Sequence, residues 1–296
     1  MSCSDCLVAF IGCGNMGGSI LRGLLDAAFS SGQHEKDEIR PVSRLIACTK
    51  SESSAARLKA SIPENQQPWV NVIASHDVPI QVMAEADVVI LSFKPFMAEG
   101  VLSSKGVKKA LAGKIVISLL AGQTTKNLAR IIENGDPHSK NSPTNVRVNP
   151  KIGARFRQSM TIIEASEPPI PSTATSSVDW IFTQVGCIKY LPEAQMNLGS
   201  VLASAALVIM TVPIERMLYG CVAEGLRRPD ALEIALRCMR GLSPALESGI
   251  QPSALRECIS SPSGATIQSL LALEEAASRV EFSKAIIPGT RHLNSS

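Results

Sequence analysis

The amino-acid sequence predicts an α/β fold, in which an N-terminal domain built on a parallel sheet is followed by an all-α C-terminal domain. Three observations lead to this fold class. The first half alternates short apolar runs with segments of helical periodicity, whereas residues from about 193 to 282 are rich in Ala and Leu and carry almost no strand signal. At 296 residues, the chain also exceeds what one hydrophobic core usually supports. We therefore expect two domains, 1–192 and 193–296.

The apolar runs of the first half are expected to form parallel strands. They are mainly apolar throughout, as in strands buried on both faces, and comprise residues 7–11, 44–48, 87–92 and 114–119. A helix is predicted between the first two runs, over residues 17–28, and its inward face is expected to consist of Ile20, Leu21, Leu24 and Leu25. Repeated β–α units of this size predict a doubly wound sheet.

The second half is expected to be helical, with breaks at its prolines. Residues 164–177, which are dense in Pro, Ser and Thr, are expected to form a loop or a helix lead-in. The stretch 198–213 is almost wholly apolar, but it is shorter than the roughly 20 residues that a membrane span requires. We expect a buried helix that packs within its domain and across a subunit interface, which predicts a homodimer or larger homo-oligomer and no membrane partner. The expected breaks lie at Pro229, Pro252 and Pro262.

Composition narrows the classes of partner and location. The net charge is only +3 and no basic stripe is interleaved with aromatic residues, so no nucleic-acid partner is expected. Eight cysteines are too dilute for a disulfide scaffold, and Cys3 and Cys6 have no second pair beside them, so no metal site is expected. The first apolar run is too short for a secretory signal, which predicts a cytoplasmic protein. The histidines are expected at the surface or in loops: His34, His76, His138 and His292.

A G-x-G-x-x-G motif follows the first apolar run and begins the first predicted helix. Gly12 permits a tight turn, Gly14 lets the backbone approach a pyrophosphate, and Gly17 lets the helix pack closely on the strand. The helix N-terminus offers free N–H groups to the phosphates, so Asn15 and Met16 are also expected at the cofactor. The motif in this context predicts a Rossmann-like domain that binds a dinucleotide.

The end of the second predicted strand bears on the choice of nicotinamide cofactor. An NAD site usually has a carboxylate there, but residues 47–51 place no acid at the tip of this strand, and Asp37 and Glu38 precede the strand at the wrong end. Lys50, Ser51 and Arg57 are suited to a 2′-phosphate, which favours NADPH, with NADH as the alternative. The alternative interpretation of the two basic side chains is that they are ordinary solvated charges.

Four segments, in order along both predicted domains, are similar to motifs of one enzyme family. They are FIGCGNMGGSILRGL at 10–24, DVVILSFKP at 87–95, SLLAG at 118–122 and SSPSGATIQSLLALE at 260–274. In these segments, which span most of its length, the chain resembles the pyrroline-5-carboxylate reductase family. The resemblance implies further cofactor contacts from Ser92, Lys94, Pro95, Ala121 and Gly122.

The last of these segments also has a physical interpretation as the start of a helix. Ser261 is a good N-cap, and Pro262 suits the first helical position. The open end would then present the amides of Ser263, Gly264 and Ala265 to a carboxylate-sized anion. A plain capped helix would explain the same residues without a ligand. The inward face is expected to comprise Ile267, Leu270, Leu271 and Ala277.

The resemblance implies a substrate site and a reaction. Ser261, Gly264 and Ala265 would bind the carboxylate of a cyclic imine, and Thr266, the candidate catalytic residue, would hydrogen-bond the ring nitrogen. The reaction would be the NADPH-dependent reduction of 1-pyrroline-5-carboxylate to proline. In such a reaction the cofactor carries the hydride chemistry, and the protein aligns the two rings.

Two segments depart from the family pattern. The family's Arg-x-Met-Pro-Asn-Thr-Pro run is replaced by residues 147–153, which keep only Arg147 and Pro150. Its Ser-Gly-Ser-Gly-Pro turn is replaced by residues 203–207, where the helix is expected to continue. Three interpretations stay open: a proline-forming reductase with an altered pocket, a reductase of a related imine such as a methylated pyrroline carboxylate in a specialised pathway, and a non-catalytic partner of an active homologue. The retained 261–266 motif argues against the third.

Two other classes of protein share part of this plan. β-Hydroxyacid dehydrogenases also join a Rossmann domain to helices, but they need a catalytic lysine in a helix of the second domain, and residues 197–250 contain no lysine. A binding-only NADP sensor would need the first domain but would have no use for the 261–266 motif.

Overall fold

The computed structural model describes residues 6–30, 44–133, 141–276 and 278–295. The chain forms two compact units, Met1–Ser200 and Val201–Ser296. The division lies inside helix α8 (Glu193–Ala223), later than the expected 192/193 boundary, because the first turns of this helix are hydrogen-bonded to residues of the first unit. The predictions for Cys3, His34, Asp37, Glu38 and His138 concern residues outside the described ranges.

An eight-stranded sheet forms the centre of the first unit, with the order β3-β2-β1-β4-β5-β6-β7-β8. Neighbouring strands are parallel, except that β6 and β7 pair antiparallel. β1, β2, β4 and β5 occur where the sequence predicts strands, whereas the other strands are not predicted. The strands are β1 Leu7–Ile11, β2 Arg44–Thr49, β3 Val70–Ala74, β4 Val88–Leu91, β5 Ile115–Ser118, β6 Thr144–Asn149, β7 Ser159–Ala165 and β8 Gly186–Pro192.

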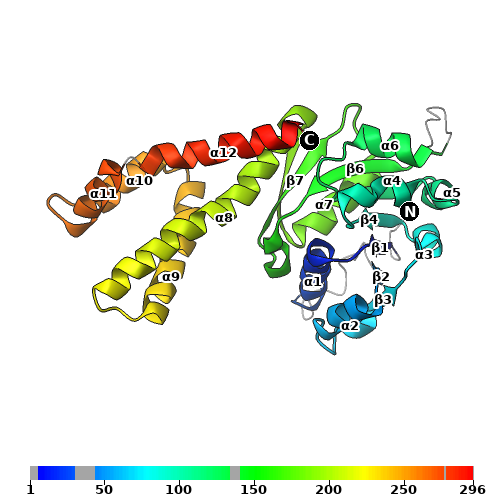
Figure 1. Cartoon of the computed structure of the whole chain (residues 1–296), viewed down its shortest axis with the longest axis horizontal. Coiled ribbons are helices and arrows are strands. Elements are labelled where there is room, and N and C mark those ends of the chain that lie inside the picture. Colours follow the sequence, from blue (N-terminus) through cyan, green and yellow to red (C-terminus); the bar gives the residue numbers. More distant parts are fainter. Residues whose placement is uncertain (1–5, 31–43, 134–140, 277, 296) are drawn as a thin grey trace. The chain divides into compact units, whose positions relative to one another are not determined.

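Helices cover both faces of this sheet, as a doubly wound fold requires (Figure 1). One face packs against α1 (Asn15–Ser30) and α7 (Ser172–Thr183). The other packs against α3 (Ile80–Glu85), α4 (Ala98–Leu102), α5 (Val107–Leu111) and α6 (Thr125–Glu133). The remaining elements are α2 (Glu52–Ala60) and the 3₁₀ helices η1 (Gln67–Trp69), η2 (Pro95–Met97) and η3 (Ile152–Phe156). The predicted α/β class with an N-terminal Rossmann-like domain is confirmed.

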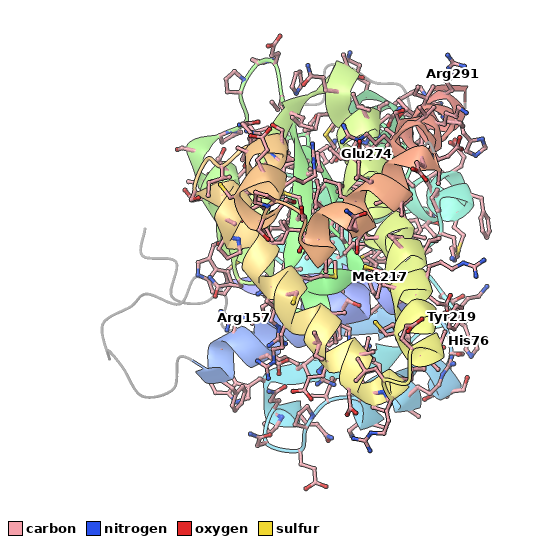
Figure 2. All side chains as sticks on the ribbon, turned by 90° about the vertical axis from the view of Figure 1, so that its left-hand side faces the viewer. His76, Arg157, Met217, Tyr219, Glu274 and Arg291 are labelled. Carbon is pink, nitrogen blue, oxygen red and sulfur yellow. The ribbon has the colours of Figure 1, made fainter. Side chains whose placement is uncertain are left out.

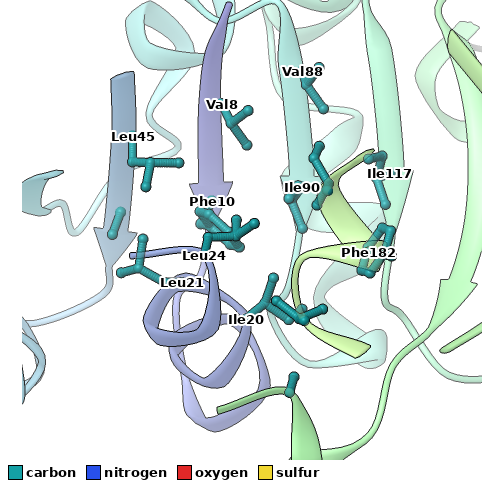
Figure 3. Packing of buried hydrophobic residues seen from close by; sticks show 14 of the residues in the cluster. Val8, Phe10, Ile20, Leu21, Leu24, Leu45, Val88, Ile90, Ile117 and Phe182 are labelled. Atoms are coloured by element: carbon teal, nitrogen blue, oxygen red, sulfur yellow. The ribbon is translucent and has the colours of Figure 1, made fainter. Parts of the chain in front are cut away.

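The predicted inward face of α1 lies in the core. Figure 3 shows its apolar side chains packed against Phe10 of β1, with Phe182 of α7 on the same side of the sheet. At 25 cal/mol per Å², burial of such side chains contributes about 2 kcal/mol each. This packing fixes the start of α1 against the end of β1, where the glycine motif lies. Each of the predicted residues is at most 4% exposed: Ile20, Leu21, Leu24 and Leu25.

The second unit consists of helices. After α8 come α9 (Arg228–Glu247), α10 (Pro252–Ile259), α11 (Ala265–Glu275) and α12 (Ser278–Ser295). The breaks expected near Pro229 and Pro252 are found, because each proline occupies the first or second position of a helix, where its missing N–H is tolerated. α8 runs without a break through residues 203–207, as the sequence predicts.

The apolar stretch 198–213 of α8 is mostly not buried by the described chain, so the burial that the sequence predicts depends on the expected subunit interface, which stays a prediction. Leu202, Val208 and Val212 are 56%, 68% and 62% exposed. Met217 and Tyr219, labelled in Figure 2, are exposed as well. α9 to α12 leave most of α8 uncovered, so a single copy of the chain does not supply its apolar contacts. By length and composition alone, α8 could cross a membrane, because an 18-residue stretch within it has a mean hydropathy of 1.8, a property shared by apolar helices of soluble proteins.

The start of α11 differs from the expectation. Ser261 and Pro262 precede a turn instead of opening the helix, and the N-cap is Gly264, whose N–H bonds to the carbonyl of Ser261 at 3.1 Å. The reason is that Ser263 has a φ of 59°, a left-handed conformation that interrupts the helix. On the predicted inward face, Leu271 is 48% exposed, whereas Ile267 and Leu270 are half-buried, and Ala277 lies outside the described residues.

Candidate cofactor and substrate sites

A cavity of about 690 Å³ opens at the carboxyl ends of β1 to β5. In open α/β sheets, this is the edge at which ligands bind. Most residues predicted to contact the cofactor line this cavity, and the exceptions are Gly17, Ser51 and Gly122. The cavity is lined by nine predicted cofactor contacts: Gly12, Gly14, Asn15, Met16, Lys50, Ser92, Lys94, Pro95 and Ala121.

The glycine loop forms a tight turn that leaves room above Gly14. Gly12 has a φ of 82°, and a Cβ there would lie 2.6 Å from the Cβ of Phe93, so only glycine fits. A Cβ on Gly17 would lie 2.7 Å from the hydroxyl of Ser92, which explains its structural role behind the cavity. A Cβ on Gly14 would meet only the carbonyl of Gly12, at 3.9 Å. The fold itself therefore does not require glycine at position 14, and the contact of Gly14 with a pyrophosphate stays a prediction.

Two thiols lie at the floor of the same cavity. The N–H of Cys13 donates to the carbonyl of Cys48 at 2.7 Å, which joins the glycine loop to the end of β2. Burial raises the pKa of Cys13 to about 12, with a smaller contribution from Cys48, and burial raises the pKa of Cys48 to about 11. Both thiols are therefore neutral near pH 7, and they add no negative charge beside the expected phosphates.

The turn between β2 and α2 gathers hydroxyl groups and basic side chains. Ser51 is the N-cap of α2 and accepts a hydrogen bond from the N–H of Ser54 at 3.3 Å. The hydroxyl of Ser54 accepts from Arg57 at 3.2 Å, and Lys50 is exposed at the cavity. Ser54 was not predicted from the sequence, although its position three residues after an N-cap serine indicates that it faces the same turn. This group has the donors that a 2′-phosphate requires.

Removal of the basic side chains of Lys50 and Arg57 should therefore change the KM for NADPH and not the KM for NADH. The double substitution Lys50→Ala, Arg57→Ala is expected to raise the KM for NADPH about tenfold and to leave the KM for NADH unchanged, because only NADPH carries the 2′-phosphate. Steady-state kinetics with both cofactors measure this. Lys59→Ala, which removes an exposed charge from the same helix, is the control and should change neither value. An equal rise for both cofactors would contradict the assignment.

The loop after β3 completes the cavity on its other side. Ser75, His76 and Asp77 line it. His76, labelled in Figure 2, is exposed, as the sequence predicts, but its position at the cavity was not anticipated because β3 itself is not predicted. This loop and the β2–α2 turn face the half of a Rossmann cavity that takes the adenosine part of a dinucleotide.

A buried polar network occupies the end of β6, where the sequence departs from the family pattern. The guanidinium of Arg147 lies 3.6 Å from the carboxylate of Glu164 and donates to the side chain of Asn197 at 2.9 Å. Thr125 donates to the same carboxylate at 2.9 Å. Both charged side chains are at most 10% exposed, so the ion pair is shielded from water. Sequence reasoning did not identify this network, because its residues are far apart in the chain.

In the second unit, the 261–266 motif forms an exposed turn and helix start. The N–H of Gly264 is used within the turn, and the first intrahelical bond of α11 runs from Gln268 to the carbonyl of Gly264. The amides left to meet an anion are thus those of Ala265, Thr266 and Ile267, two residues later along the chain than the sequence suggests. Gly264 lies against Ser261, since a Cβ there would meet the Ser261 hydroxyl at 2.5 Å. The substrate-binding roles of Ser261, Gly264, Ala265 and Thr266 stay predictions.

Comparison with known proteins identifies the two parts of the chain. Residues 193–294 match the family described as "Pyrroline-5-carboxylate reductase dimerisation", and residues 7–122 match "NADP oxidoreductase coenzyme F420-dependent". Among solved structures, a Plasmodium falciparum pyrroline carboxylate reductase with NADP bound has a TM-score of 0.77 at 20% identity, covering 99% of this chain and 98% of that one. This likeness supports the fold.

Two relatives align with the chain over nearly their whole length. The pyrroline-5-carboxylate reductase of Neurospora crassa is 34% identical over 98% of this chain and 92% of the relative. That of Lophium arboricola is 34% identical over 97% of this chain and 92% of the relative. Identity at this level, together with both matched domains, shows that the chain belongs to the pyrroline-5-carboxylate reductase family.

Proposed function

We propose that this protein catalyses the NADPH-dependent reduction of 1-pyrroline-5-carboxylate to proline. One observation carries the proposal: in a chain of this family, the glycine loop, the β2–α2 turn and the ends of β4 and β5 line one cavity at the carboxyl edge of the sheet. The relatives' names indicate the substrate, and the NADP bound to the P. falciparum reductase indicates the cofactor.

The residues of the cavity fit the cofactor. The open space above Gly14 and the N-terminus of α1 receive the pyrophosphate, and the β2–α2 turn receives the 2′-phosphate through Lys50 and Arg57. The nicotinamide half then lies toward the loops after β4 and β5, where Lys94 and Ala121 line the cavity. Bound NADPH supplies the hydride, and the chain's own residues orient the ring and exclude water.

The helix start of α11 would hold the substrate. The amides of Ala265 and Thr266 and the hydroxyl of Ser261 bind the carboxylate, and the hydroxyl oxygen of Thr266 accepts a hydrogen bond from the protonated ring nitrogen. An imine is already electrophilic when it is protonated, so the chain needs to orient the ring more than it needs a strongly tuned acid. We further propose that the protein is cytoplasmic and works as a homodimer or larger homo-oligomer, in which the exposed apolar surface of α8 is covered.

NADPH oxidation measured against three imines tests the proposal. The substrates are 1-pyrroline-5-carboxylate, a methylated pyrroline carboxylate and the six-membered homologue. The proposal expects the highest kcat/KM with the first. A preference for the methylated compound would favour the alternative that the altered 147–153 segment serves a related imine. No turnover with any of the three, despite NADPH binding, would favour a non-catalytic paralogue.

Thr266→Ala tests the assignment of the catalytic residue. The loss of one hydrogen bond to a nitrogen that carries charge should lower kcat by about 10- to 100-fold and leave the dissociation constant for NADPH nearly unchanged. Ser269→Ala is the matched control, because Ser269 lies on the same helix and its hydroxyl donates to the local carbonyl of Ala265. Full activity of Thr266→Ala would remove Thr266 from the mechanism.

A further inference from the structure

A buried lysine lies directly after β6. Lys151 is 6% exposed, although a lysine side chain is almost never buried to this extent in a folded protein. Its ammonium donates to the side-chain oxygen of Asn149 at 2.9 Å and to the backbone carbonyl of Ser200 at 3.0 Å. Its backbone N–H donates to the hydroxyl of Ser159 at 2.9 Å. Both the main chain and the side chain of Lys151 are therefore held in one arrangement.

Lys151 and Arg147 both donate hydrogen bonds to helix α8. Arg147 bonds to Asn197, and Lys151 bonds to Ser200, three residues later in α8. Residues three apart lie on the same face of a helix, so two cations from the end of β6 hold one face of the first turns of α8. We call these four residues the β6–α8 clamp.

The buried ammonium of Lys151 is not explained by a gain in stability. Burial lowers the pKa of Lys151 to about 8, which means that the folded protein disfavours the charged form relative to the unfolded chain. Near pH 7 the group is charged in both states, so the folded protein carries the full penalty of burying the charge. An apolar side chain of similar length would serve the fold at least as well. A role at the candidate active site explains the burial of Lys151 better than a gain in stability does.

The clamp borders the half of the cavity that takes the nicotinamide. β6 pairs with β5 in parallel, with Arg147 opposite Ser118. The residues that follow Ser118 include Leu119 and Ala121, which line the cavity. Because the adenosine half lies toward β2 and β3, the ends of β5 and β6 flank the reacting end of the cofactor.

We propose that Lys151 is a positioning residue of this reductase, which fixes the end of β6 beside the nicotinamide half of the cavity by clamping it to α8. The inference rests on the proposed function. Lys151 holds Asn149 and Ser200 and transfers no proton to the substrate. Loss of the clamp would let the strand end shift, and a shift of about 1 Å near the reacting rings is enough to lower the rate severely.

The test compares Lys151→Met with Lys126→Met. Methionine keeps the length of the side chain and removes the charge and its hydrogen bonds. Lys126 is the matched control, since it bonds to Glu193 of the same helix at 3.0 Å but is 81% exposed. For Lys151→Met, kcat should fall about tenfold, the KM for NADPH should stay within about twofold, and the thermal midpoint at pH 7 should not fall. Amide hydrogen exchange in the first turns of α8 should become faster. Lys126→Met should match the wild type in all four measurements.

Each result decides the matter. A lower thermal midpoint with unchanged kcat would make Lys151 a purely structural residue, and unchanged exchange in α8 would show that the clamp does not hold the helix; either result overturns the proposal. If Lys151→Met does not fold, Lys151→Gln is judged by the same measurements. A wild type without turnover on any imine would refute the proposed function and the positioning role together, whereas faster exchange in Lys151→Met would still establish the clamp.

Discussion

A Gly14→Val variant is expected to fold like the wild type and to bind NADPH at least about 100-fold more weakly, a loss of roughly 3 kcal/mol. The nearest atom to a Cβ at this position is the carbonyl oxygen of Gly12, 3.9 Å away, so the empty protein tolerates the side chain. The same space is where the pyrophosphate approaches the backbone. Fluorescence titration with NADPH measures the affinity, and thermal unfolding without cofactor measures the fold.

Gly12→Val is the informative comparison. Gly12 combines a left-handed φ of 82° with a position 2.6 Å from the Cβ of Phe93, so a side chain there strains the backbone and displaces a neighbouring strand end. This variant should lose both stability and binding. If Gly14→Val destabilised the cofactor-free protein as much as Gly12→Val does, the distinction between a ligand-facing glycine and a structural one would be wrong.

The strands that the sequence predicts are those at the centre of the sheet. β1, β2, β4 and β5 are buried on both faces and read as apolar runs. β3 and β8 lie at the two edges, where most residues are half-buried or exposed, so these strands lack a fully buried apolar run. β6 places Asn145, Arg147 and Asn149 at alternate positions, and these polar residues hide the strand from a search for apolar runs.

The cofactor cavity was predictable because its contacts are local. The glycine motif directly follows β1 at the edge where the parallel strands end, whereas the contacts of Lys94 and Pro95 are implied by the family resemblance. What the sequence could not provide were contacts set by tertiary structure. The Arg147–Glu164 pair joins β6 to β7, and the conformation of Ser263 delays the start of α11. α8 is exposed in one copy of the chain although the sequence predicts that it is covered, partly across a subunit interface, since apolar periodicity shows that a helix needs a cover but not how much of it each chain supplies.

Arg147→Met should destabilise the protein by about 3–5 kcal/mol, which makes it the substitution with the largest expected effect on stability. Glu164 is 5% exposed at its side chain, and its second carboxylate oxygen has Arg147 as its ion-pair partner and no hydrogen bond. Without the guanidinium, the hydroxyl of Thr125 would be the one hydrogen-bond partner that the described residues offer this buried carboxylate. Urea unfolding at one protein concentration measures the loss.

Two further variants show whether burial is the cause. Arg130→Met breaks the pair of Arg130 and Glu99, which has the same N–O distance of 3.6 Å but is 61% and 66% exposed, and it should cost less than about 1 kcal/mol. Adding Glu164→Gln to Arg147→Met should restore most of the stability, because the group left behind is then neutral. Such a recovery would show that the loss of stability in Arg147→Met comes from the unpaired charge of Glu164 rather than from the lost contact. Equal losses for Arg147→Met and Arg130→Met, or no recovery in the double variant, would show that this buried pair does not carry the stability of the β6 end.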